Sequence, residues 1–177
     1  ALSAADREAV VSSLSKVQSI LSRERSPMVR IVRLEKLNDD ALRLLEEYYE
    51  AVHVVQRDST GAMRKIVGDA SSGMWLAYLN DEAVGCVVLR RMAAIPFAGE
   101  CKRLYVQPRA RGKGIADALL AAQEEYARRQ RMRWIYLDSY DDLKTAIALY
   151  KRRGYVPCER YNDNPQATVF LRKGLGE

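Results

Sequence analysis

Apolar residues recur with two different periods along the 177-residue chain, and these periods predict an α/β protein. Spacings of three and four residues are typical of helices that bury one face, whereas alternation is typical of half-buried strands. Helical patterns cover residues 3–22, 37–52, 114–131 and 142–153. Strand patterns cover 28–34, 74–79, 82–92, 100–107, 133–139, 155–161 and 167–173. The stretch 56–73 is rich in Gly, Ser and charge, which predicts a loop with one helical turn at most.

The order of these elements indicates a mixed, mostly antiparallel sheet flanked by helices. The sequence "NDE" is a hairpin signal between the second and third predicted strands, which begin an antiparallel meander. A parallel pair of strands needs a long crossover. The central parallel step therefore runs from strand 100–107 through helix 114–131 to strand 133–139.

The first predicted helix is separated from the rest of the chain. Ser3 suits its N-cap, and Pro27 disfavours helix at the residue before it. We therefore expect a helical appendage over 1–26 and one domain over 27–177. The appendage is amphipathic and is expected to pack on the domain or on a partner. Its apolar stripe consists of Val10, Leu14, Val17 and Leu21.

Composition narrows the classes of function. The single histidine, His53, argues against His-based metal sites and Ser-His-Asp catalysis, and we expect no metal. Three scattered cysteines without a C-x-x-C pair favour free thiols in a reducing cytoplasm. No apolar run approaches the roughly 18–20 residues that cross a membrane. The net charge of +6 indicates an anionic partner, and five basic residues but no acidic one lie between Cys101 and Gly114.

The stretch "VQPRARGKGIADALL", residues 106–120, places that charge where a strand gives way to a helix. The first N–H groups of a helix point outward and its dipole favours anions, so this junction suits a phosphate. Gly112 and Gly114 allow close backbone approach, and Arg109, Arg111 and Lys113 supply charge. The spacing matches neither a Walker loop nor a dinucleotide-binding fingerprint.

These residues resemble the GNAT superfamily of acyl-CoA N-acyltransferases, whose pyrophosphate loop reads Gln/Arg-x-x-Gly-x-Gly/Ala. A second block, "AIALYKRRGY" at 146–155, is similar to the family pattern A-x-x-L-Y-x-x-x-G-F/Y. The resemblance covers about residues 28–177. It implies a GNAT-like sheet whose fourth and fifth strands splay apart around acetyl-CoA as cosubstrate.

The resemblance also implies roles for individual residues. Tyr150 matches the family's acid for the departing thiolate, and its ordinary pKa of about 10 keeps it protonated. Glu100 lies where some members carry a catalytic base, while many others use a water chain. Strand alternation would put Glu100, Lys102, Leu104 and Val106 on one face. Relatives often have an Asn where this chain has Leu143. The implied acetyl-CoA contacts are Leu104, Tyr105, Val106, Arg109, Arg111, Gly112, Lys113, Gly114, Ile115 and Ala116.

The acceptor is expected to be a small-molecule amine. In this family the final turn, here 159–167, often contacts the acceptor, so Tyr161, Asn162 and Asn164 are candidates. Asn-Asp-Asn-Pro is also ordinary turn chemistry. Asp58 and Asp69 would attract a cationic amine, or lie on a solvated loop.

Two alternatives come from other classes of protein. Helix 3–22 resembles the dimerisation helix of MarR-type winged-helix regulators, and fusions of that module to GNAT domains exist. The chain would then sense acyl-CoA or an amine for a DNA-binding partner; a plain homodimer is the other interpretation of this helix. Direct nucleic-acid binding by the basic runs is disfavoured, because aromatic residues are not interleaved with them.

Overall fold

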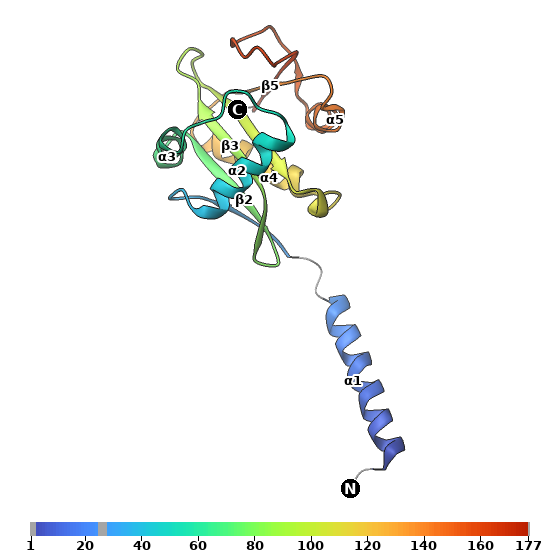
Figure 1. Cartoon of the computed structure of the whole chain (residues 1–177). Coiled ribbons are helices and arrows are strands. Elements are labelled where there is room, and N and C mark those ends of the chain that lie inside the picture. The colour runs from blue at the N-terminus through green and yellow to red at the C-terminus, as the bar shows by residue number, and fades with distance from the viewer. Residues whose placement is uncertain (1–2, 25–27, 177) are drawn as a thin grey trace.

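The computed structural model describes residues 3–24 and 28–176. Seven strands form one sheet in the order β1-β2-β3-β4-β5-β7-β6, antiparallel except for the β4–β5 pair. Figure 1 shows this sheet with the helices around it. This confirms the predicted fold class. The strands are β1 (Val29–Arg33), β2 (Gly73–Leu79), β3 (Glu82–Arg91), β4 (Ala98–Val106), β5 (Trp134–Ser139), β6 (Val156–Pro157) and β7 (Val169–Gly174). The α-helices are α1 (Ala4–Glu24), α2 (Asp39–Ala51), α3 (Thr60–Gly68), α4 (Ile115–Arg129) and α5 (Lys144–Arg152), with a 3-10 turn at Pro108–Ala110.

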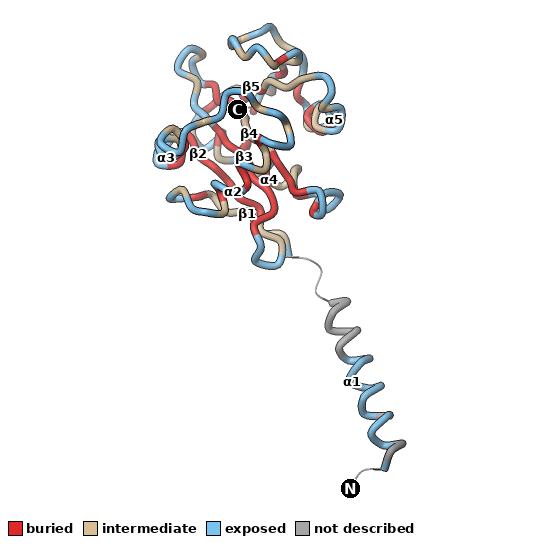
Figure 2. Tube along the Cα trace, viewed as in Figure 1, coloured by how far each residue is buried: buried red, intermediate tan, exposed pale blue. Residues whose placement is uncertain are grey.

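Each face of the sheet carries its own core. Leu44 of α2 and Met63 of α3 are buried against one face, together with Val88 of β3. Leu119 of α4 and Leu149 of α5 are buried against the other. The buried residues follow the sheet and the inner sides of these helices (Figure 2). The domain is therefore a sheet between two helical layers.

Helix α3 corrects the prediction of a loop over 56–73. Ser59 accepts a hydrogen bond from the backbone of Ala62, which caps a helix of nine residues. Met63 and Val67, four residues apart, are both buried. Their packing on the sheet outweighs the poor helix propensity of the surrounding glycines.

The C-terminal strands are shorter than predicted. Instead of 155–161, β6 contains only Val156 and Pro157, and one further bond joins the Cys158 N–H to the Phe170 carbonyl at 3.0 Å. Residues 159–167 then form an irregular turn. Their side chains, rather than a strand ladder, supply most of their hydrogen bonds, as described below.

Strand β4 contains a bulge that overturns the predicted alternation. Cys86 pairs with Tyr105 and Val88 with Lys102, so β4 has one more residue than β3 between these pairs. Arg103 occupies this bulge with a left-handed φ of 56°. Lys102 therefore shares a face with Glu100, but Leu104 and Val106 pack in the opposite core. The prediction of a common face for these four residues is wrong because the bulge shifts the period.

The two central strands separate at the bulge. Parallel pairing of β4 with β5 ends at Glu100 and Tyr136, although β4 continues to Val106 and β5 to Ser139. The splay that the family resemblance implied is therefore present. It leaves a gap at the carboxyl ends of two parallel strands, where α/β folds place their ligands.

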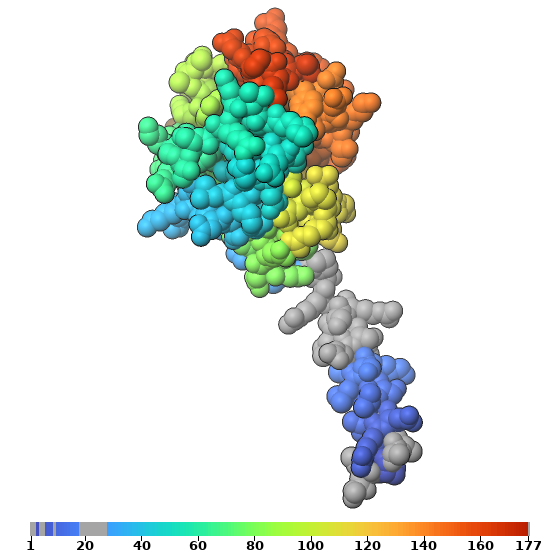
Figure 3. Space-filling model, in the orientation of Figure 1, coloured from blue at the N-terminus to red at the C-terminus, as the bar shows by residue number. Residues whose placement is uncertain are grey.

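Helix α1 confirms the predicted N-terminal helix. The described side chains of this helix are all exposed (Figure 3). They include Val10, Leu14 and Val17. The predicted boundary near residue 26, with Pro27, lies outside the described residues, as does the side chain of Leu21. Across the part of the chain that is described, no helix combines the length and apolar character needed to span a membrane.

Candidate functional site

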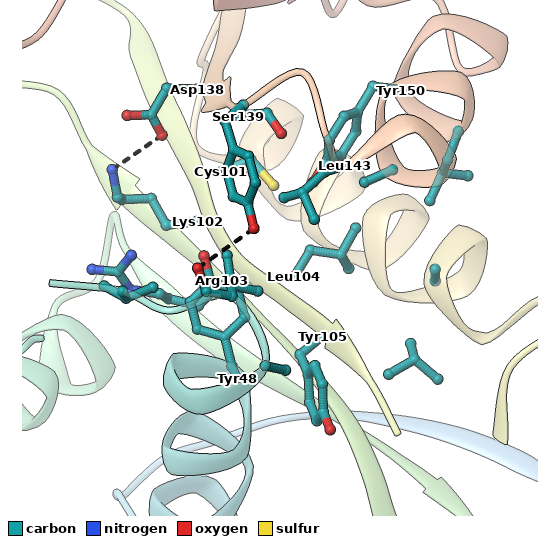
Figure 4. Close-up of a pocket in the computed structure, with 18 of the residues that line it drawn as sticks. Tyr48, Cys101, Lys102, Arg103, Leu104, Tyr105, Asp138, Ser139, Leu143 and Tyr150 are labelled. Atoms are coloured by element: carbon teal, nitrogen blue, oxygen red, sulfur yellow. Dashed lines mark hydrogen bonds and ion pairs between the residues drawn. The ribbon is translucent and has the colours of Figure 1, made fainter. Parts of the chain in front are cut away.

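A cleft of about 1670 Å³ occupies the splay between β4 and β5 (Figure 4). One end is bordered by the loop before α4 and by α5. The other end is bordered by the segment after α2, residues 52–58, and by the turn 162–167. The predicted site residues that line this cleft are Leu104, Tyr105, Val106, Arg111, Gly112, Gly114, Ile115, Ala116, Tyr150, Asn162 and Asn164.

The loop before α4 has the geometry of an anion site. Gly112 and Gly114 have φ of 75° and 73°, and a Cβ at either would meet no atom within 4 Å. Gly114 is the N-cap of α4, so the first N–H groups of the helix face the cleft entrance without intrahelical partners. Arg111 lines the cleft and donates from Nε to the Val106 carbonyl at 3.0 Å. Glycine backbone, helix dipole and guanidinium together fit a pyrophosphate.

Two predicted phosphate ligands do not line the cleft. Arg109 forms an ion pair with Glu82 and donates to the Gln107 side chain. Lys113 is exposed outside the lining. Lys144 and Arg152 of α5 line this end instead, and sequence analysis did not select them. The only feature of the sequence that could have identified them was their position on the predicted helix that carries Tyr150.

Tyr150 lies on α5 with its side chain largely buried at the cleft wall. Its ring packs edge-on against Tyr155, with centroids 5.7 Å apart. Burial raises the pKa of Tyr150 well above its ordinary value, and the charge of Asp138 contributes in the same direction. The hydroxyl therefore stays protonated at neutral pH and can donate a proton inside the cleft.

Glu100 is held by four donors. Its side chain is 1% exposed and receives bonds from Arg90 at 2.5 Å and Lys102 at 3.0 Å, with Tyr161 and Asn162 each at 3.2 Å. It is not among the cleft-lining residues. This placement does not favour the predicted base role, because a base must reach the proton it removes.

We expect Glu100→Gln to destabilise the protein by about 2–3 kcal/mol, because two cations would lose their shared carboxylate. We expect a smaller loss of folding stability than for a fully buried ion pair, because about half of the Arg90 side chain is exposed. Urea unfolding measures the change. Glu46→Gln, which breaks an exposed ion pair with Arg57, is the matched control and should leave the urea midpoint near that of the wild type. Equal midpoints for the two variants would contradict the structural role.

The final turn holds a second carboxylate. The side-chain amides of Asn162 and Asn164 both donate to Asp138 Oδ2 at 2.9 Å, whereas Tyr161 bonds to Glu100 and does not line the cleft. Asp138 was missed by sequence analysis. Its signal was a polar Asp-Ser pair ending the otherwise apolar strand 134–139, at the edge where parallel strands place functional residues.

The two aspartates of the segment 56–73 lie in different surroundings. Asp58 lines the cleft, receives a bond from Arg103 Nε at 2.8 Å, and accepts from the Tyr49 hydroxyl at 3.0 Å. Burial raises its pKa, but the bond and charge of Arg103 outweigh burial and hold the pKa below its ordinary value. Asp69 bonds to Ser71 outside this cleft.

Comparison with known proteins agrees with this geometry. The model of the Acetyltransferase (GNAT) family matches residues 36–155. An uncharacterized N-acetyltransferase of Schizosaccharomyces pombe is 30% identical over 157 residues, which are 82% of this chain and 92% of that protein. An IAA acetyltransferase of Azospirillum brasilense is 28% identical, covering 84% of this chain and 99% of its own.

Solved structures share the fold. A GNAT-family acetyltransferase from Staphylococcus aureus superposes with a TM-score of 0.71 at 19% identity, over 84% of this chain and 100% of its own. The family match spans both the glycine loop and the Tyr150 helix, which border one cleft in this structure. The chain belongs to the GNAT acetyltransferase family.

Proposed function

We propose that this acetyltransferase moves an acetyl group from acetyl-CoA to the amine of a small-molecule acceptor. The observation that carries the proposal is the single cleft that joins the α4 glycine loop, Tyr150 and a polar acceptor end. The loop suits the pyrophosphate of a CoA thioester. The opposite end is lined by charged and amide side chains, among them Asp58, Asn162 and Asn164.

The chain's own residues divide the work. The glycine loop and Arg111 bind the pyrophosphate. The splayed part of β4 at Leu104–Val106 lies beside the pantetheine arm that carries the acetyl group. The acceptor ammonium ion first loses one proton to water. Its nitrogen then forms a bond to the thioester carbon as the carbon–sulfur bond breaks, and the nitrogen gives a second proton to water. Tyr150 protonates the thiolate and regains a proton from water. The net products are an amide, free CoA and one proton.

Two measurements test the proposal together. Calorimetric titration should show acetyl-CoA binding, and a panel of amines should produce amine-dependent release of free CoA thiol. No binding of acetyl-CoA would overturn the proposal. Binding without turnover of any amine would limit the chain to acyl-CoA recognition.

Other expectations remain predictions. We propose a homodimer because apolar residues of α1 are exposed. We propose a cytoplasmic location because Cys86, Cys101 and Cys158 are free thiols. The comparisons cover the acetyltransferase domain and leave the regulator alternative untested. No described contact favours that alternative, so we do not adopt it.

A further inference from the structure

Two charged residues face each other across the cleft just beyond the last β4–β5 pair. Lys102 of β4 and Asp138 of β5 both line the cleft, and Lys102 Nζ lies 3.5 Å from Asp138 Oδ1. Figure 4 shows this contact bridging the gap, with Tyr150 on the adjacent helix. The pair therefore lies between the part of the cleft proposed for the thioester and the part proposed for the acceptor.

Asp138 is the most enclosed carboxylate that lines the cleft, and its nearest cation is more distant than those of Asp58 and Asp117. Asp58 has Arg103 at 2.8 Å, and Asp117 has Arg152 at 3.0 Å. Asp138, with a side chain only 8% exposed, has its nearest described cation at 3.5 Å. That cation, Lys102, lies closer to Glu100, at 3.0 Å. Asp138 therefore shares its counter-ion with a carboxylate that holds it more tightly.

The turn after β6 orients Asp138 and leaves one of its oxygens available. Both Asn162 and Asn164 bond to Oδ2, and their amides carry no charge to neutralise it. Among the described contacts, Oδ1 receives only the long bond from Lys102. A carboxylate oxygen has two lone pairs, so Oδ1 can accept a further donor.

The surroundings keep Asp138 ionised. Burial raises its pKa, but the charge of Lys102 and the bonds from Asn164 and Asn162 outweigh burial and hold the pKa below its ordinary value. An ionised, enclosed carboxylate with an open lone pair is suited to a cationic donor. A general base would need a pKa closer to neutrality, so the geometry supports binding rather than proton removal.

We propose that Asp138 binds the protonated amine of the acceptor through Oδ1, with Asn162 and Asn164 as positioning residues. The inference rests on the proposed acetyltransferase function and assigns the side chain that holds the protonated amine of the acceptor in the cleft. It also gives the final turn a role different from direct acceptor contact: its asparagines hold the carboxylate that makes the contact.

The test measures binding rather than turnover. n-Hexylamine, 3-phenylpropylamine and 1,4-diaminobutane are titrated by NMR into the enzyme saturated with CoA, beside 1-hexanol, 3-phenyl-1-propanol and 1,4-butanediol. We expect at least one amine to bind about tenfold or more tightly than its alcohol. Asp138→Asn should remove this preference while the affinity of the alcohol stays within about twofold.

Two further variants keep the outcome interpretable. Asp163→Asn makes the same charge change on an exposed residue of the same cleft and should retain the preference. Asp138→Ser repeats the loss of charge with a smaller side chain, in case the new amide disturbs the turn. An amine preference that survives both Asp138 variants, or no preference in the wild type, would overturn the inference. Loss of acetyl-CoA binding would instead count against the proposed function alone.

Discussion

Tyr150→Phe is expected to lower kcat by about 10²–10⁴-fold, the range for loss of a positioned general acid. The phenol lines the cleft from α5 and is the proton donor of the proposed mechanism, and its raised pKa keeps it protonated. The ring remains, so packing against Tyr155 and the affinity for acetyl-CoA should change little. Thiol release measures kcat, and calorimetry measures the dissociation constant of acetyl-CoA.

Tyr155→Phe is a matched control five residues away. Its ring contacts Tyr150, but its buried hydroxyl has no hydrogen-bond partner among the described residues. Removing that hydroxyl relieves a buried polar group without touching the cleft lining, so activity should be retained. Equal loss of kcat in both variants would point to packing rather than proton donation.

The pKa of Tyr150 also predicts a pH profile. A raised pKa means that the protonated, active form persists to higher pH than for an ordinary tyrosine. We therefore expect no alkaline loss of kcat from Tyr150 titration up to about pH 10. A loss of kcat between pH 8 and about pH 10, absent from the Tyr150→Phe variant, would contradict the assignment.

The sequence predicted the layers and the sheet well because apolar periodicity reports burial directly. Helix α2 lies within the predicted range 37–52, and the side chain of Asn38 caps it by accepting a hydrogen bond from the backbone N–H of Ala41. The bulge at Arg103 was not predictable, because no glycine marks it and alternation alone assumes a regular strand. Helix α3 was missed because its propensity is low and tertiary packing stabilises it.

For the site, local motifs were predictable and long-range partners were not. The glycine loop and Tyr150 lie within short blocks of sequence, and both line the cleft. Asp138, by contrast, depends on Asn162 and Asn164, more than twenty residues away. The predictions for Arg109 and Glu100 did not take their ion pairs into account. Arg109 pairs with Glu82 of β3, and Glu100 pairs with Arg90 of the same strand.

Gly112→Asp is expected to weaken acetyl-CoA binding by about 100-fold or more, because a carboxylate would face the pyrophosphate at close range. Gly112 has φ of 75° and open space beside its Cα, so the new side chain would extend into the region that the phosphates need. The repulsion adds to the loss of close backbone approach. Calorimetric titration of acetyl-CoA measures the change directly.

Backbone strain alone must be separated from this effect, and Gly154→Asp provides the comparison. Gly154 follows α5 with φ of 86° and equally open surroundings, but it does not line the cleft. Both variants place a non-glycine residue in the left-handed region, at a similar cost of about 1–2 kcal/mol in folding stability. Only Gly112→Asp should lose the ligand, because only there does the added carboxylate meet phosphate. If both variants bound acetyl-CoA like the wild type, the pyrophosphate would have to lie elsewhere, and the assignment of the loop before α4 would fail.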